Sequence, residues 1–303
     1  MKNNNIDDYN FDLIDILALL WSRKSIVLSV TLFAAVFSVW YAYSLPNIYK
    51  STAILSPTSS SNSLATKLSS YSSFAGLAGV SLPGGEVSKS DEAIERIKSY
   101  NFFNVHFLPN IKLQNLMAVS RWESESNKVI YDDDLFDGKS GKWFRNSSSK
   151  KNIPSAQQSY LAYKKALNIS VNTSNSFVSI SIEHKSPYIA KKWVEIIIDK
   201  INFSMKEEDK NRAENSIKFL NEISQPINIQ SLKDAIVNLL EEQMKILMLS
   251  SANKNYVFNT LDYPLVPEKK YKPNRSIVCI MGTIFGFLLS IIIALSLRKK
   301  ITE

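Results

Sequence analysis

Cysteine and histidine are nearly absent from this 303-residue sequence, which has one Cys and two His. Cys279 lies in an apolar run, so no intrachain disulfide can form and cysteine usage says nothing about the redox compartment. His106 and His184 lack the paired spacing of metal ligands. We therefore expect no metal site and no cofactor.

Charge is missing from two long stretches, which hold 25 residues between Lys24 and Lys50 and 22 residues between Arg275 and Arg298. Each stretch is long enough to cross the ~30 Å hydrocarbon layer as a helix. The sequence therefore predicts transmembrane helices at residues 25–45 and 276–297. Because neither contains an ionisable group, a proton or ion pathway is disfavoured.

The first span has an alternative interpretation as a cleaved signal peptide, because Ala42-x-Ser44 resembles a cleavage site. The apolar core of a signal peptide is only about 7–15 residues long, whereas this run is longer and follows an N-terminal segment with four Asp residues. An uncleaved anchor fits this pattern better.

Two spans place both termini on one side of the membrane. Lys2, Arg23 and Lys24 precede the first span and only Lys50 follows it closely, although the basic residues around the second span favour the opposite orientation. Since the first span usually dominates, we expect residues 1–24 and 298–303 in the cytoplasm and residues 46–275 on the far side. Thirty cytoplasmic residues are too few for a kinase or nucleotide-binding domain.

The segment between the spans is predicted to be an α+β domain. Alternating apolar residues predict a strand that ends at Pro57 and a hairpin formed by residues 167–171 and 178–182. Capping and spacing predict one helix that begins near Ser88 or Ser90 and ends by Pro109, and another at 156–166. Residues 58–85 are expected to be a loop, either membrane-proximal or a simple linker, and residues 120–155 a loop with short elements.

The longest predicted helix begins at Pro187, after Ser186, and meets no Pro or Gly before Pro226. At 1.5 Å per residue its roughly 38 residues would extend ~57 Å. A second helix is expected at about 231–253. Helices that extend beyond their own core, here over about 187–254, can pair with each other or stack against neighbouring copies.

The chain then returns to the second span through a strand near 256–260, which we expect to pair with the strand that follows the first span. Three prolines, which favour extended backbone, would make a stiff strap: Pro264, Pro267 and Pro273. A basic cluster stands at the membrane face: Lys269, Lys270, Lys272 and Arg275. Its partner is either anionic lipid headgroups in general or the phosphates of a lipid-linked sugar.

Gly282 and Gly286 have the spacing that lets another helix approach closely within a membrane. We expect them to form a membrane-helix packing site. The sequence leaves open whether the partner is the first span, a neighbouring copy or another protein.

No catalytic set is visible. Gly138-Lys139-Ser140 resembles the end of a phosphate-binding loop, but Asp133 stands where that motif needs its first Gly. Asp132 to Asp134 could hold a cation, although an acidic run of this kind is more typical of a solvated loop.

The order of several phrases between the two spans resembles the polysaccharide co-polymerases, specifically the Wzz-type chain-length determinants of O-antigen. The phrases are Pro46-Asn47-Ile48-Tyr49 with Ala53-x-Leu55-x-Pro57, Gly76-Leu77-Ala78-Gly79-Val80, Phe177 through Pro187-x-x-Ala190, and Leu261-Asp262 leading to Val266-Pro267-Glu268-Lys269 and Pro273. The sequence departs from the family at Lys270, where many members continue with Pro, and its helical region is short beside long-arm members.

The resemblance implies a bacterial inner-membrane protein with no catalysis of its own. It implies a ring-shaped homo-oligomer with an α/β base in the periplasm and long projecting helices, which acts with a membrane O-antigen polymerase on lipid-linked polysaccharide. No nucleic-acid partner is expected. The alternative is a structural adaptor for polysaccharide export, while an extracytoplasmic sensor and a membrane enzyme fit less well.

Overall fold

The computed structural model describes residues 21, 23–58, 88–144, 153–224, 230–253 and 255–299. The N-terminal residues before 21, most of the expected loop at 58–85 with its Gly76–Val80 patch, and the tail beyond 299 lie outside the described residues. The chain forms two units, residues 1–47 with 271–303 and residues 48–270. Each unit is described by itself.

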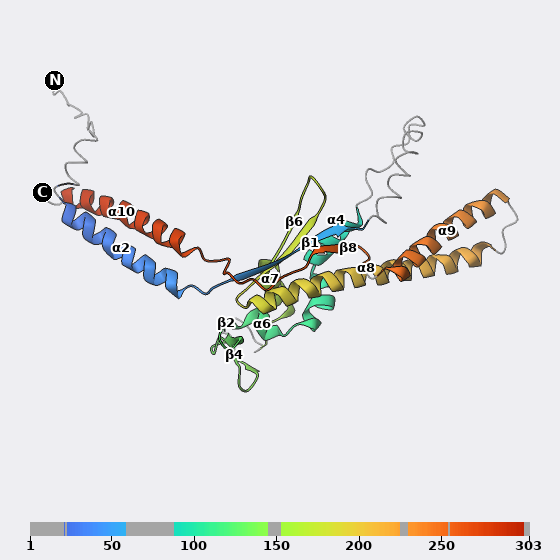
Figure 1. Ribbon diagram of the computed structural model, residues 1–303, viewed down its shortest axis with the longest axis horizontal. Helices are drawn as coiled ribbons and strands as arrows, with labels where there is room; N and C mark the ends of the chain where they lie inside the picture. The colour runs from blue at the N-terminus through green and yellow to red at the C-terminus, as the bar shows by residue number, and fades with distance from the viewer. Residues whose placement is uncertain are drawn as a thin grey trace, which may run out of the picture. The chain divides into compact units, whose positions relative to one another are not determined.

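The first unit consists of two apolar helices, α2 (Lys24–Ser44) and α10 (Arg275–Lys299), which lie side by side (Figure 1). Both are long and apolar enough to cross a membrane. Their large side chains are mostly exposed, for example Phe33 at 75% and Phe285 at 64%. A core helix of a soluble protein would bury such side chains, so this surface requires an apolar environment.

The second unit is built on a four-stranded antiparallel sheet in the order β6-β7-β1-β8. Its strands are β1 (Tyr49–Pro57), β6 (Leu167–Val171), β7 (Val178–His184) and β8 (Phe258–Asp262). The predicted hairpin is confirmed as β6–β7, with Leu167 opposite Ile182 and Val171 opposite Val178. The predicted pairing of the two membrane-adjacent strands is also confirmed, since β8 pairs with β1.

One face of the sheet is covered by α8 (Pro187–Ser224), which packs on β1 and β7. Leu55 of β1, Ile180 of β7 and Ile197 of α8 belong to one core cluster, and all three are fully buried. Burying each such side chain contributes roughly 1.5–3 kcal/mol. The period of two in the strands and of about 3.6 in the helix thus produces the core.

Shorter helices complete the layer over the sheet. Ser88 caps α4 (Lys89–Lys98) by accepting a hydrogen bond from the Asp91 amide, and Ser155 caps α7 (Ala156–Ala166) in a capping box with Gln158. The other helical segments between them are α5 (Tyr100–Phe102), η2 (Phe103–Phe107), η3 (Leu108–Asn110) and α6 (Leu113–Met117). Two small hairpins occupy the predicted irregular region: β2 (Val119–Glu123) with β3 (Lys128–Tyr131), and β4 (Phe136–Asp137) with β5 (Lys142–Trp143).

The C-terminal half of α8 pairs with α9 (Gln230–Ala252), and Figure 1 shows the two helices as a hairpin that leaves the sheet layer. The α+β fold with two terminal apolar helices is confirmed. α8 has the predicted length of 38 residues. Such a length exceeds what coverage of five-residue to nine-residue strands needs, so part of α8 lies beyond the sheet.

Asn202 joins α8 to the start of β8. Its Oδ1 accepts hydrogen bonds from the Val257 amide (2.8 Å) and the Phe258 amide (3.0 Å). Its Nδ2 donates to the Phe258 carbonyl (3.2 Å) and to the Ile198 carbonyl (3.1 Å). A buried amide that satisfies four backbone interactions fixes the place where the chain re-enters the sheet.

We expect Asn202→Ala to lower the free energy of unfolding by about 3 kcal/mol, because it leaves buried backbone groups without partners. Thermal unfolding of the purified full-length protein in detergent would measure this loss. The matched control is Asn110→Ala, since exposed Asn110 makes one hydrogen bond, to the His106 carbonyl. Equal destabilisation by the two variants would contradict this role for Asn202.

Candidate functional site

The two glycines of α10 lie against α2. A Cβ built on Gly282 would overlap the Cβ of Ser38, and a Cβ on Gly286 would overlap that of Ala34. Because residue numbers rise along α10 as they fall along α2, the two helices are antiparallel. The Ser38 hydroxyl lies 3.4 Å from the Cys279 carbonyl, so the seam also carries an interhelical hydrogen bond.

Ser38 and Ala34 were not predicted as partners of these glycines. The signal for them was present, because Ala34 and Ser38 are small residues four positions apart in the first span. Within one chain, the partner of the glycine pair is therefore the first span. A role for this packing in assembly remains a proposal.

The residues of the predicted strap belong to both units. Pro264 is buried and Pro267 half-buried in the 48–270 unit, where the Ser51 hydroxyl donates to the neighbouring Leu265 carbonyl at 2.7 Å. Pro273 is half-buried in the helical unit. The side chains of Tyr263 (68%) and Leu265 (71%) are exposed. The strap segment is thus held to β1 through its backbone while it presents apolar side chains outward.

The four predicted basic residues are also divided between the units. Lys269 and Lys270 are exposed in the 48–270 unit, and exposed Lys272 lies over the Tyr271 ring at 5.0 Å in the other. Arg275 starts α10 and contacts the Tyr43 ring at 4.7 Å from its centroid, and it donates to the Asn47 amide oxygen at 3.3 Å. Arg275 therefore packs against the end of α2, whereas Lys269 and Lys270 are the members most open to a ligand.

Two motifs that resembled ligand-binding sequences, Gly138-Lys139-Ser140 and Asp132 to Asp134, lie in turns. Asp137 accepts a hydrogen bond from the Lys139 amide (2.8 Å), so Gly138-Lys139-Ser140 forms the turn between β4 and β5. Asp132 accepts one from the Asp134 amide (3.0 Å). Among the residues that the structure describes, no three His, Cys, Asp or Glu side chains are grouped to hold a metal.

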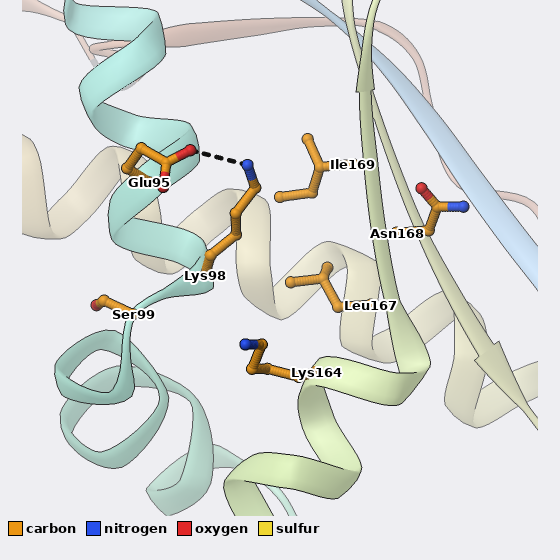
Figure 2. A pocket seen from close by; sticks show the side chains of 7 residues that line it. All are labelled: Glu95, Lys98, Ser99, Lys164, Leu167, Asn168 and Ile169. Atoms are coloured by element: carbon orange, nitrogen blue, oxygen red, sulfur yellow. Dashed lines mark hydrogen bonds and ion pairs between the residues drawn. The ribbon is translucent and has the colours of Figure 1, made fainter.

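A pocket of about 610 Å³ opens beside β6 (Figure 2). Leu167 and Ile169 of β6 form one wall, and Glu95, Lys98 and Ser99 at the end of α4 form the other. Figure 2 shows Lys164 pointing into the space from α7, while Asn168 points away on the other side of the strand. Lys98 is bound to Glu95 at 2.8 Å. We did not predict this pocket from the sequence, since its two lysines lie 66 positions apart.

A second, smaller pocket of about 330 Å³ contains His184 and Trp193. The His184 Nδ1 accepts a hydrogen bond from the Ser186 amide (2.9 Å), which assigns the proton to Nε2 and lets it donate to the Asn115 carbonyl (2.8 Å). Desolvation by burial lowers the pKa of His184. The ring is therefore neutral and already has a partner at each nitrogen.

We expect His184 to make stability fall at mildly acidic pH. Because its folded-state pKa lies below the ordinary value of 6.5, its contribution is fully present above pH 6.5 and is lost as pH falls below that value. The midpoint of thermal unfolding, measured from pH 7.5 to 5.0, should fall less in His184→Gln than in the wild type. The control is His106→Gln, since His106 is less buried and should account for a smaller part; equal slopes in all three proteins would contradict the assignment.

We expect the double variant Gly282→Leu, Gly286→Leu to insert normally but to assemble poorly or to alter polysaccharide length, because its side chains force α2 and α10 apart. Membrane fractionation measures insertion, the mass of the detergent-solubilised particle measures assembly, and a gel of surface polysaccharide measures its length. Ile284→Leu with Phe285→Leu is the matched control on the exposed side of α10. Wild-type assembly and wild-type polysaccharide length in the glycine variant would remove the packing proposal.

A model of a known protein family matches part of the chain. The family described as Wzz, chain length determinant protein, matches residues 9–103, which include α2, β1 and α4. The match confirms the resemblance to chain-length determinants that the sequence phrases indicated. No curated protein matches the chain.

Two solved structures are similar at low identity. A full-length bacterial polysaccharide co-polymerase shares 14% identity, with 96% of this chain and 99% of that chain covered at a TM-score of 0.42. A fragment of WzzB, a polysaccharide co-polymerase from Salmonella Typhimurium, shares 14% identity, with 75% of this chain and all of the fragment covered at a TM-score of 0.28.

Proposed function

We propose that this protein is a non-catalytic regulator of O-antigen polysaccharide chain length. It acts as an oligomeric periplasmic scaffold beside a membrane polymerase and biases the point at which elongation stops. The single observation that carries this proposal is the match of residues 9–103 to the chain length determinant family. The alternative is a structural inner-membrane adaptor for polysaccharide export, which would share the two-helix anchor.

The anchor supports a location in the inner membrane. α2 and α10 expose apolar side chains along their length, as lipid-facing helices do. With both termini in the cytoplasm, the 48–270 unit lies in the periplasm, where lipid-linked polysaccharide is a candidate partner. Exposed Lys269 and Lys270 suit contact with its phosphates or with other anionic headgroups.

An exposed apolar stripe on α9 supports the oligomeric part of the proposal. Val237 (60%), Met244 (53%) and Met248 (69%) recur at helical spacing, and with Leu240 and Leu249 they line an open groove of about 640 Å³. Such a surface is costly to leave in water. A second copy of the chain would cover it, and unbranched Met side chains adapt readily to a packed partner.

Deleting the gene is expected to leave polymerised glycan on the cell but to broaden its length distribution, because the scaffold sets a preferred length and does not join sugar units. A gel of surface polysaccharide measures this directly. Complete loss of polymer would instead indicate a polymerase, and loss of surface polymer with accumulation inside the envelope would favour the export adaptor.

Complementation with variants of the α9 stripe tests whether assembly is needed. Met244→Lys with Met248→Lys places charge on the groove, so we expect a smaller particle in detergent and the broadened glycan distribution of the deletion strain. Asn238→Lys is the control, because Asn238 is exposed on α9 but does not line the groove. Normal glycan lengths with both variants would argue against the stripe as an interface.

A further inference from the structure

The segment that follows β8 leaves two large side chains uncovered. Tyr263 is 68% exposed and Leu265 is 71% exposed, while Pro264 between them is buried. The buried Ser51 hydroxyl donates a hydrogen bond to the Leu265 carbonyl (2.7 Å), so the backbone of this segment is held to β1. Two such side chains close together on a fixed backbone indicate a contact site.

We propose that Tyr263 and Leu265 insert into the interfacial layer of the membrane that α2 and α10 cross. Lys269 and Lys270 bind anionic headgroups of the same surface, so the partner of this segment is lipid. The proposal rests on the membrane location contained in the proposed function. It adds a second attachment of the 48–270 unit to the bilayer, beside the two chain connections.

The length of the connecting chain keeps this segment near the membrane in any orientation of the unit. The 21 residues of α2 extend about 31 Å, close to the ~30 Å thickness of the hydrocarbon layer, so Ser44 lies at the edge of that layer. Ser51 follows seven residues later, which is at most about 25 Å of extended chain. On the other side, ten residues separate Leu265 from Arg275, the first residue of α10. Both connections allow Leu265 to reach the interfacial layer.

Aromatic side chains gather at the same end of the sheet. Tyr49, two residues before Ser51 in β1, contacts Trp122 with ring centroids 5.5 Å apart. The Trp122 centroid lies 6.1 Å from that of Tyr188, which is 49% exposed. Tyr and Trp collect at membrane–water interfaces because their apolar rings carry a polar group. The composition of this end is therefore typical of a surface that meets lipid headgroups.

The charge of the segment suits an anionic surface. Residues 263–275 contain one acidic residue, Glu268, and four basic residues: Lys269, Lys270, Lys272 and Arg275. Lys269 and Lys270 are exposed. An anionic membrane attracts basic residues only within about a Debye length, ~8 Å at physiological salt. This short-range attraction favours a segment that lies on the surface over one that stands above it.

A second protein is the competing partner for exposed apolar side chains. Tyr263, Leu265 and the nearby Leu261 leave roughly 400 Å² uncovered, about half of the ~800 Å² that each partner contributes to a standard protein interface. Shallow insertion into lipid needs no such area, because the two membrane helices already hold the unit close to the surface. The size of the patch therefore favours lipid.

Fluorescence of the full-length protein in reconstituted vesicles tests the insertion. With Cys279→Ala as background, Leu265→Cys is labelled with the environment-sensitive dye NBD and reconstituted into phosphatidylethanolamine and phosphatidylglycerol. Lipids that carry a nitroxide near the headgroup end of the acyl chain quench a dye that lies in the interfacial layer. We expect the dye at residue 265 to emit at shorter wavelength than in water and to be quenched by these lipids.

Two further labelled positions serve as controls. Phe219 is similarly exposed (60%), but it lies 32 residues, or about 48 Å, from the first residue of α8. That helix begins three residues after His184, which pairs with Tyr49 at the aromatic end. A dye on Phe219→Cys should therefore not be quenched. Ile277→Cys, exposed in the first turn of α10, reports whether the protein lies in the membrane and should be quenched.

The lysines are tested in the same assay. Lys269→Glu with Lys270→Glu should lower the quenching at residue 265 about twofold, because it replaces attraction to anionic headgroups by repulsion. Replacing phosphatidylglycerol by neutral phosphatidylcholine should have a similar effect on the unsubstituted lysines. Unchanged quenching in both experiments would overturn the role of Lys269 and Lys270.

The outcomes separate this proposal from the membrane location on which it rests. Quenching at Ile277 without quenching at Leu265 would overturn the insertion and leave the membrane location standing. A dye at Leu265 with shifted emission but no quenching would do the same, since it indicates cover by protein.

Equal quenching at Leu265 and Phe219 would also overturn the insertion, because the contact would not be confined to this segment. Absence of quenching at all three positions would contradict the membrane location and the insertion together. Quenching at Leu265 and Ile277 but not at Phe219 would support both.

Discussion

The antiparallel pairing of β1 with β8 is the contact on which the 48–270 unit depends. These strands are separated by about 200 residues of chain, and closing a loop of that length costs about 5 kcal/mol apart from a constant. The hydrogen bond between Asn202 and the Phe258 amide and the full burial of Leu55 and Phe258 offset this loop-closure cost. As a result, the chain enters and leaves the unit on neighbouring strands, and each of the two strands continues toward one of the apolar helices.

This pairing also determines which surfaces the unit has left to offer. β1 and β7 occupy the centre of the sheet under α8, so core packing uses one face, and α8 has more length than that face needs. The excess length pairs with α9 and leaves the apolar stripe that includes Met244 and Met248. The outer edges remain with β6 and β8. The available surfaces are therefore a helix face and two strand edges, which suit contacts between proteins.

Local pattern was sufficient to predict most elements of the fold. The alternation of Leu167, Ile169 and Val171 predicted the hairpin, and the candidate caps Ser88 and Ser90 predicted the start of α4. The absence of Pro and Gly after Pro187 predicted the full length of α8. These signals are local because strand period, capping and helix propagation act over a few residues. The pairing of β8 with β1 was also predictable, since both strands adjoin the spans.

The candidate sites were harder to predict because they depend on contacts between distant residues. The glycine pair could be found from its spacing, but its partners Ala34 and Ser38 depend on the antiparallel register of two helices. The pocket beside β6 combines Lys98 with Lys164, and no local pattern joins them. The role of Asn202 was not predicted, because in the sequence a polar residue on the buried side of a helix only interrupts the apolar pattern. Its four hydrogen-bond partners are seen only in the structure.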